Sequence, residues 1–235
     1  MSSFQVFALA ALVLLALAGL LYWQLSIAEG AYLGRRVVVW LYDRFASRYE
    51  AVKAYDADWE RDTLAEPVVA FLARWPAVER AAAPAALDVA TGTGRFAAAL
   101  LGHPGFSGRV IALDLSSRML AIARVKLAPF GDRATLRRAD AQTLEDEDSA
   151  FDVVACLEAL EFLPNPDTAL GELIRVCRPG GLLVLTNRIG PDAWKMPGRT
   201  QPTPVFARRL ADLGLLRTRR VPWLVDYDLV FAEKP

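Results

Sequence analysis

The chain has 235 residues, enough for one sizeable domain and an additional segment. Its 27 basic and 27 acidic residues balance, so the net charge gives no indication of a nucleic-acid partner. The two cysteines, Cys156 and Cys177, exclude a disulfide framework, and we predict that both are small core residues. The single histidine, His103, stands between glycine and proline, and no metal site is predicted.

The amino-terminal segment is strongly apolar. Residues 2–28 contain no charged side chain, and a helix of about 20 residues covers roughly 30 Å, the thickness of the hydrocarbon core. We therefore predict a transmembrane anchor over residues 1–28. A cleaved signal peptide is the main alternative, but it would have a basic start and a shorter apolar run. Arginines follow this span and none precedes it, so the positive-inside rule predicts a single-pass protein of the cell membrane with its domain in the cytoplasm.

Residues 29–80 form a second segment with a different pattern. Within 34–52, apolar residues recur at helical spacing with arginines and aromatic residues between them. We predict an amphipathic helical linker or lid, and two arrangements stay open: a helix on the membrane surface, or one that covers the following domain. A further helix is predicted over 67–75, and 81–85 is predicted to be a short connection.

From residue 86 onward the chain alternates between short apolar strands and helices. We predict strands at 86–90, 110–113, 135–138, 152–156 and 182–186, and helices at 95–101, 117–128 and 167–177. This alternation is typical of a doubly wound, mostly parallel sheet covered on both faces. The end of the chain differs, because a helix at 203–213 is followed by two strands, 216–221 and 227–232, which are close enough for an antiparallel hairpin.

The most informative stretch is residues 87–96, which read Leu-Asp-Val-Ala-Thr-Gly-Thr-Gly-Arg-Phe. It predicts a strand, a glycine turn and a helix whose unpaired N–H groups face a ligand. Asp114 ends the next strand, where a carboxylate can accept hydrogen bonds from a ribose. The spacing of Gly92, Gly94 and Ala97 also fits the dinucleotide pattern, so a nicotinamide oxidoreductase stays open at this point.

Two further acids favour a different cofactor. Asp88 lies inside the first strand, where an amino-acid ammonium group would need a negative charge. Asp140 ends the third strand, where it can pair with an adenine amino group beside the Ala141 N–H. Together with the Arg-Pro-Gly-Gly turn at 178–181, this arrangement resembles the class I S-adenosylmethionine-dependent methyltransferases over about residues 85–235.

The resemblance implies a Rossmann-like α/β fold in residues 81–235, with seven strands and an antiparallel last strand. It implies cofactor contacts at Asp88, Gly92 and Gly94 of the first motif, with Thr91 between them. Ala90 stands where the family usually has glycine, as is common in its quinone-methylating branch. The remaining cofactor contacts that the resemblance implies are Asp114, Leu115, Asp140, Ala141 and Leu157.

The resemblance does not identify the catalytic residues, and Glu158 and Glu161 are the candidates. At i, i+3 they would share one face of a helical turn. Related quinone-precursor O-methyltransferases carry a histidine after such acids, but this chain has Phe162 there. A membrane anchor favours a small, lipophilic acceptor, such as a quinone precursor or a lipid, over nucleic acid. A module that binds S-adenosylmethionine without catalysis stays as an alternative.

Overall fold

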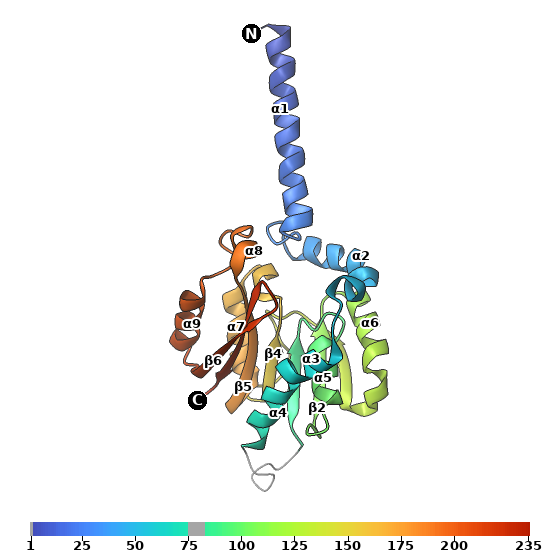
Figure 1. Cartoon of the computed structure of the whole chain (residues 1–235), viewed down its shortest axis with the longest axis vertical. Helices are drawn as coiled ribbons and strands as arrows, with labels where there is room; N and C mark the ends of the chain where they lie inside the picture. Colours follow the sequence, from blue (N-terminus) through green and yellow to red (C-terminus); the bar gives the residue numbers. More distant parts are fainter. Residues whose placement is uncertain (1, 75–82) are drawn as a thin grey trace.

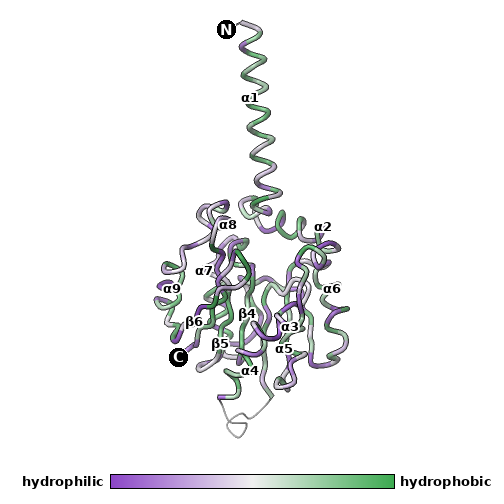
Figure 2. The backbone as a smooth tube through the Cα atoms, in the orientation of Figure 1, coloured by the Kyte–Doolittle hydropathy of each residue, from purple (hydrophilic) through white to green (hydrophobic). Residues whose placement is uncertain are grey.

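The computed structural model describes residues 2–74 and 83–235, and it shows a layered domain from which one long helix projects (Figure 1). This helix, α1 (Ser3–Tyr22), begins with a capping box in which Ser2 and Gln5 bond each other's backbone N–H groups. It continues into a π-helical turn, η1 (Trp23–Ile27). None of the residues of α1 is buried, and the tube in Figure 2 is mostly apolar along it. The combined helix is long and apolar enough to cross a membrane.

The domain is built on a seven-stranded sheet, which confirms the predicted fold class. The strand order is β3-β2-β1-β4-β5-β7-β6. Strands β3, β2, β1, β4 and β5 pair in parallel, whereas β7 is antiparallel to both β5 and β6. The strands are β1 (Ala85–Val89), β2 (Arg109–Asp114), β3 (Ala134–Arg138), β4 (Phe151–Cys156), β5 (Cys177–Arg188), β6 (Leu216–Trp223) and β7 (Tyr227–Glu233).

Helices cover both faces of this sheet. On one face, α4 (Glu66–Ala73) and α5 (Arg95–Gly102) pack on alternate strand residues such as Ala86 and Val153. On the other face, α7 (Pro166–Val176) and α9 (Thr203–Asp212) pack on the intervening residues, such as Leu87 and Val154. This alternation follows from the two-residue period of a strand. Cys156 and Cys177 are buried, as predicted.

The remaining helices connect these elements, and the first of them precede β1. They are α2 (Arg35–Lys53), α3 (Ala57–Glu60), η2 (Arg61–Ala65), α6 (Ser117–Leu127), η4 (Ala128–Arg133), η5 (Leu160–Phe162) and α8 (Gly190–Trp194). The helix predicted over 34–52 is α2. The helix predicted over 67–75 is α4, although Trp75 and part of the 81–85 connection lie outside the described residues.

A buried arginine joins the α3 segment to the sheet. The Arg95 guanidinium donates to both carboxylate oxygens of Glu60, with Nε 2.6 Å from Oε2, and to Glu158 Oε1 at 2.7 Å. The same group lies between the rings of Tyr55 and Trp223, 4.2 and 4.3 Å from their centroids. Arginine suits this site because its planar group forms bidentate ion pairs and stacks on aromatic rings at once.

Replacing this arginine should therefore weaken the whole fold. In Arg95→Ala, two carboxylates that are less than a tenth exposed lose a cation partner, and we expect the free energy of unfolding to fall by about 3–5 kcal/mol. Urea unfolding of the full chain in detergent, followed by tryptophan fluorescence, measures this change. Arg209→Ala is the control, because its partner Asp167 is exposed and such pairs contribute about 1 kcal/mol or less. Equal losses in the two variants would contradict the structural role of Arg95.

Candidate active site

The site begins at the turn between β1 and α5. Ala90, Gly92 and Gly94 all have positive φ angles, of 55°, 55° and 84°. Glycine adopts this conformation without strain, whereas Ala90 does so at some cost. A Cβ at Gly92 would meet no atom within 4 Å, so free space lies beside the turn.

Two aspartates hold this turn in place. Asp114 accepts hydrogen bonds from the Gly92 N–H at 2.9 Å and the Ser116 N–H at 2.8 Å. Asp88, only 2% exposed, accepts from Thr91 Oγ1 at 2.5 Å and from the Ala97 N–H at 3.1 Å. Burial raises the pKa of Asp114 and raises that of Asp88 to about 7, and the hydrogen bonds offset part of this effect.

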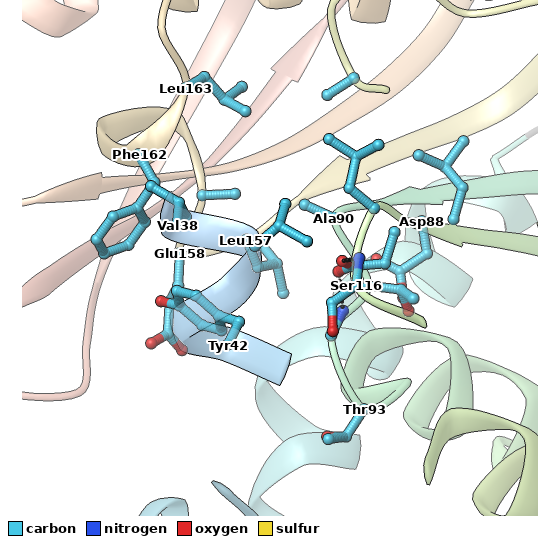
Figure 3. Close-up of a pocket in the computed structure, with 18 of the residues that line it drawn as sticks. Val38, Tyr42, Asp88, Ala90, Thr93, Ser116, Leu157, Glu158, Phe162 and Leu163 are labelled. Atoms are coloured by element: carbon cyan, nitrogen blue, oxygen red, sulfur yellow. Dashed lines mark hydrogen bonds between the residues drawn. The ribbon is translucent and has the colours of Figure 1, made fainter. Parts of the chain in front are cut away.

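The turn opens into a cavity of about 990 Å³, counted with the space at its mouth. Asp88, Ala90, Thr91, Gly92, Asp114, Leu115, Ala141 and Leu157 line it, which brings together most of the residues that the sequence predicted. Gly94 lies one residue beyond the lining residue Thr93 and packs against α6, where a Cβ would lie 3.3 Å from the Ala123 side chain. In Figure 3, Asp88 and Ser116 lie at one end of the cavity, and Glu158 and Phe162 lie at the other.

Asp140 is the exception among the predicted residues. It is not among the residues that line the cavity, although its neighbours Ala139 and Ala141 are. Its carboxylate pairs with Arg35 of α2 and accepts a hydrogen bond from the Gln142 N–H at 3.1 Å. Arg35 itself lines the cavity, so the pair closes one edge of it.

Helix α2 forms a wall of this cavity through Val38, Val39, Tyr42 and Tyr49. Asp43 fixes the helix by accepting hydrogen bonds from Ser116 Oγ at 2.6 Å and the Arg118 N–H at 3.1 Å. An acidic side chain at the start of α6 is favourable, because the free N–H groups carry a partial positive charge there. Sequence reasoning missed Arg35, Asp43 and Arg95, since all three act on residues far away along the chain.

The two candidate acids have different surroundings. Glu158 has a positive φ of 51° and precedes η5, so the helical turn predicted to include it does not form. Its carboxylate pairs with Arg95 and Lys53. Glu161 lies in η5 and is buried, accepting hydrogen bonds from Tyr227 Oη at 2.6 Å and Arg188 Nε at 3.0 Å. Burial raises the pKa of Glu161, and Arg188 and Tyr227 counteract this rise.

A second cavity, of about 1740 Å³ with its mouth, adjoins the first. Tyr42, Tyr49, Glu158 and Phe162 line both cavities. The second one is bounded by η1, α2, α8 and the turn between β6 and β7, with Leu25, Ile27 and Leu224 among its apolar lining residues. Glu161 is not among the lining residues of either cavity.

Comparisons with known proteins identify the family. Residues 86–181 match a methyltransferase domain. The chain is 30% identical over 184 residues to the demethylmenaquinone methyltransferase of Lactiplantibacillus plantarum, with 73% of each chain covered. It belongs to the class I S-adenosylmethionine-dependent methyltransferases. This family membership overturns the nicotinamide alternative and identifies an enzyme that uses S-adenosylmethionine.

One further relative and one solved structure show the range of the likeness. The phosphatidylethanolamine N-methyltransferase of Cereibacter sphaeroides is 36% identical over 110 residues, with 45% of this chain and 51% of that one covered. A crystal structure of an S-adenosylmethionine-dependent methyltransferase from Aquifex aeolicus superposes with a TM-score of 0.55 at 22% identity. It covers 76% of this chain and 98% of that one, and it shares the fold.

The first cavity of the methyltransferase fits the cofactor chemically. The free space beside Gly92 admits a ligand close to the backbone. The Asp114 carboxylate, which accepts hydrogen bonds from the Gly92 and Ser116 N–H groups, has further acceptor capacity for ligand hydroxyl groups. Asp88 supplies a buried acid near the turn. When bound, the cofactor supplies an activated methyl group on a sulfonium.

The raised pKa of Asp88 predicts a pH dependence of stability. The folded chain retains the Asp88 proton up to about pH 7, whereas an unfolded aspartate loses it near pH 4. Stability therefore falls as pH rises between these values, by about 1.4 kcal/mol per pH unit. Asp88→Asn keeps an oxygen acceptor for Thr91 and Ala97 but removes the ionisation. We expect the difference in melting temperature, Asp88→Asn minus native, to increase from pH 5 to pH 8.

Thermal unfolding at pH 5, 6, 7 and 8 without cofactor measures this difference. Asp212→Asn, at an exposed position at the end of α9, serves as the control and should show no such trend. A difference between Asp88→Asn and the native chain that stays constant over this pH range would show that Asp88 does not ionise in this way.

Proposed function

We propose that this methyltransferase is anchored in a membrane by α1 and transfers the methyl group to a small, lipophilic acceptor that enters through the second cavity. The observation that carries the proposal is the position of that cavity. It begins beside η1, at the end of the proposed membrane span, and meets the first cavity at Tyr42, Tyr49, Glu158 and Phe162. A molecule dissolved in the bilayer would thus have a short path to the methyl donor.

The chemistry of the second cavity supports an acceptor with an apolar body and a polar head. Its apolar lining residues include Leu25, Ile27, Phe45 and Leu224, and its polar lining residues include Glu29, Glu158, Arg188, Asp192, Lys195 and Tyr227. Two relatives are named as methylating demethylmenaquinone and phosphatidylethanolamine, and both names describe lipid-soluble molecules. We therefore propose a quinone precursor or a lipid as the acceptor.

In the first cavity we propose specific roles for the predicted residues. Asp114 and Leu115 bind the ribose, Ala141 lies at the adenine, and Leu157 lies at the methionine end. The positive ammonium group of the bound cofactor favours the ionised form of Asp88, which also accepts from Thr91, while Ala90, Gly92 and Gly94 shape the turn. The Asp140 carboxylate is paired with Arg35. It would therefore bind adenine either while it keeps this ion pair or after the ion pair breaks.

Methyl transfer needs the acceptor held in line with the donor in the absence of water. Tyr42, Tyr49 and Phe162 enclose the junction of the two cavities with ring surfaces. Burial raises the pKa of both tyrosines well above 10, so they stay protonated and act as hydrogen-bond donors. The Glu158 carboxylate lines both cavities. We propose that it acts as the general base when the methyl acceptor must lose a proton. Glu161 instead supports Arg188 and Tyr227.

The cofactor site is tested by calorimetric titration. The full chain in detergent should bind S-adenosylhomocysteine and not NAD. Asp114→Ala removes the acceptor for the ribose and for Gly92, and it should abolish measurable binding, whereas Asp212→Ala should leave the affinity unchanged. An Asp114→Ala chain that binds as tightly as the native one would remove the ribose assignment.

The acceptor is tested with labelled S-adenosylmethionine and fractionated lipid extracts. Label should enter a quinone-precursor or lipid fraction with the native chain in nanodiscs. In Glu158→Gln, transfer should fall about 10²-fold or more while affinity for S-adenosylhomocysteine is retained. Full transfer by Glu158→Gln would limit this residue to a structural role, and no transfer to any fraction by the native chain would favour the binding-module alternative.

The proposed topology places the domain on the cytoplasmic side of the cell membrane, because Arg35, Arg36, Arg44 and Arg48 follow the span. Protease added to inside-out vesicles should then degrade the domain, and protease added to right-side-out vesicles should leave it intact. The reverse pattern would place the domain outside, and release of the chain from washed membranes would exclude an anchor.

A further inference from the structure

We propose that the face of the domain around the end of α1 docks on the surface of an anionic bilayer, as a second membrane contact separate from the span. This docking face is defined by exposed apolar residues of four segments: Leu33, Trp40, Phe45, Trp194, Leu224 and Val225. The proposal rests on the proposed function of α1 as an anchor. It adds that the domain is held flat against the membrane, with the mouth of the second cavity inside the contact.

The junction between α1 and the domain is fixed by polar contacts, so the direction of the span is set by the domain. Trp23 Nε1 donates to the Lys195 carbonyl at 3.1 Å, and Tyr32 Oη donates to the Pro197 carbonyl at 2.8 Å. Arg199 donates to the Ala31 carbonyl at 2.6 Å. Figure 1 shows α2 and α8 on either side of the end of α1. A membrane crossed by α1 would therefore meet these two helices.

The side chains exposed there are of the kind that membrane interfaces favour. Trp194 of α8 is 73% exposed, Val225 of the β6–β7 turn is 87% exposed, and Trp40 of α2 is 55% exposed. Tryptophan is enriched at membrane interfaces. Covering several exposed apolar side chains with one apolar surface is favourable, because it removes all of them from water. Tyr42 and Tyr49 of α2, by contrast, line the cavities. Helix α2 thus has one face for the site and another for the proposed membrane contact.

The positive charges of α2 favour a membrane surface that contains anionic lipids. Arg36, Arg44 and Arg48 are exposed on it, and no ion pair involves them among the residues that the structure describes. The Arg44 guanidinium lies 5.8 Å from the Trp40 ring centroid. Arginines near an anionic leaflet each contribute about 1 kcal/mol of attraction. Among the acids nearby, Asp192 pairs with Lys195 and Glu29 accepts from Tyr42 Oη. Burial and the neighbouring charge of Asp192 raise the pKa of Asp226 in the β6–β7 turn.

The docking face also surrounds the entrance to the second cavity. Phe45 and Leu224 belong both to the docking face and to the cavity lining. Leu25 and Ile27 of η1 line the same cavity. Contact with the bilayer would thus place a lipid-soluble acceptor at an entrance that carries these apolar side chains beside the charged residues Glu29, Asp192 and Lys195.

Labelled cysteine variants of the full chain test this contact. Trp194→Cys and Val225→Cys, each carrying an environment-sensitive fluorophore, are reconstituted in vesicles of phosphatidylcholine and phosphatidylglycerol. Nitroxide groups at a shallow position of the acyl chains then quench fluorophores near the interface, and in a second set of vesicles nitroxide groups near the chain ends quench fluorophores at the bilayer centre. Val13→Cys, in the middle of α1, reports the span. Val125→Cys is the matched control. Val125 is 77% exposed, but it lies in the last turn of α6, whereas α2 contacts the first turn of that helix through Asp43.

We expect the fluorophores at residues 194 and 225 to be quenched several-fold more strongly than the one at 125. Replacing Arg36 and Arg48 by glutamate should reduce this quenching, and Arg124→Glu on α6 should not. Strong quenching at 13 by the deep nitroxides, with equal, weak quenching at 194, 225 and 125 by the shallow ones, would overturn the docking face while leaving the anchor intact. Weak quenching at all four positions by both sets of nitroxides would instead contradict the anchor. Self-quenching between copies at 194 or 225, without quenching by lipid, would identify a second chain as the occupant and overturn the proposal.

Discussion

The buried Arg95 guanidinium is the interaction on which the arrangement of this site depends. One planar group bonds Glu60 and Glu158 and also lies 4.2 and 4.3 Å from the ring centroids of Tyr55 and Trp223. It therefore links α3, the helix that follows the glycine turn, the end of β6 and the segment after β4. A buried charge remains favourable only when its hydrogen bonds are complete, so each of these segments must be in place for the others to fold correctly.

Helix α2 is the second constraint, because its residues line both cavities. It is held through Arg35–Asp140, Asp43 at the start of α6, Glu50–Lys126 and Lys53–Glu158. These contacts are polar and lie along one side of the helix, so they leave the opposite side free. The strained backbone at Glu158 lies where this wall meets the sheet. Positive φ angles in non-glycine residues tend to occur at functional sites, where the surrounding structure fixes them.

The central domain was predictable because its signals are local. Short apolar strands alternate with helices, turn residues separate them, and the Gly92-Thr-Gly94 turn follows a strand directly, so periodicity and spacing were sufficient. The hairpin at the end of the chain was predicted in the same way, but the insertion of β7 between β5 and β6 was not, since strand order depends on which edges pair. The helical turn over Glu158 and Glu161 was predicted wrongly, because the left-handed backbone at Glu158 is stabilised by Arg95, Lys53 and Thr186 from other segments.

The sequence alone thus determined the fold class, the apolar span and the acids that face the cofactor cavity, since each depends on residues close together in the chain. The tertiary structure decided which groups meet. It joined Arg35 to Asp140 across 105 positions, placed Glu158 between two cavities, and set the end of α1 against Lys195 and Pro197. The physical reason is that ion pairs, ring contacts and cavity walls form between side chains that only the folded backbone brings within a few ångströms.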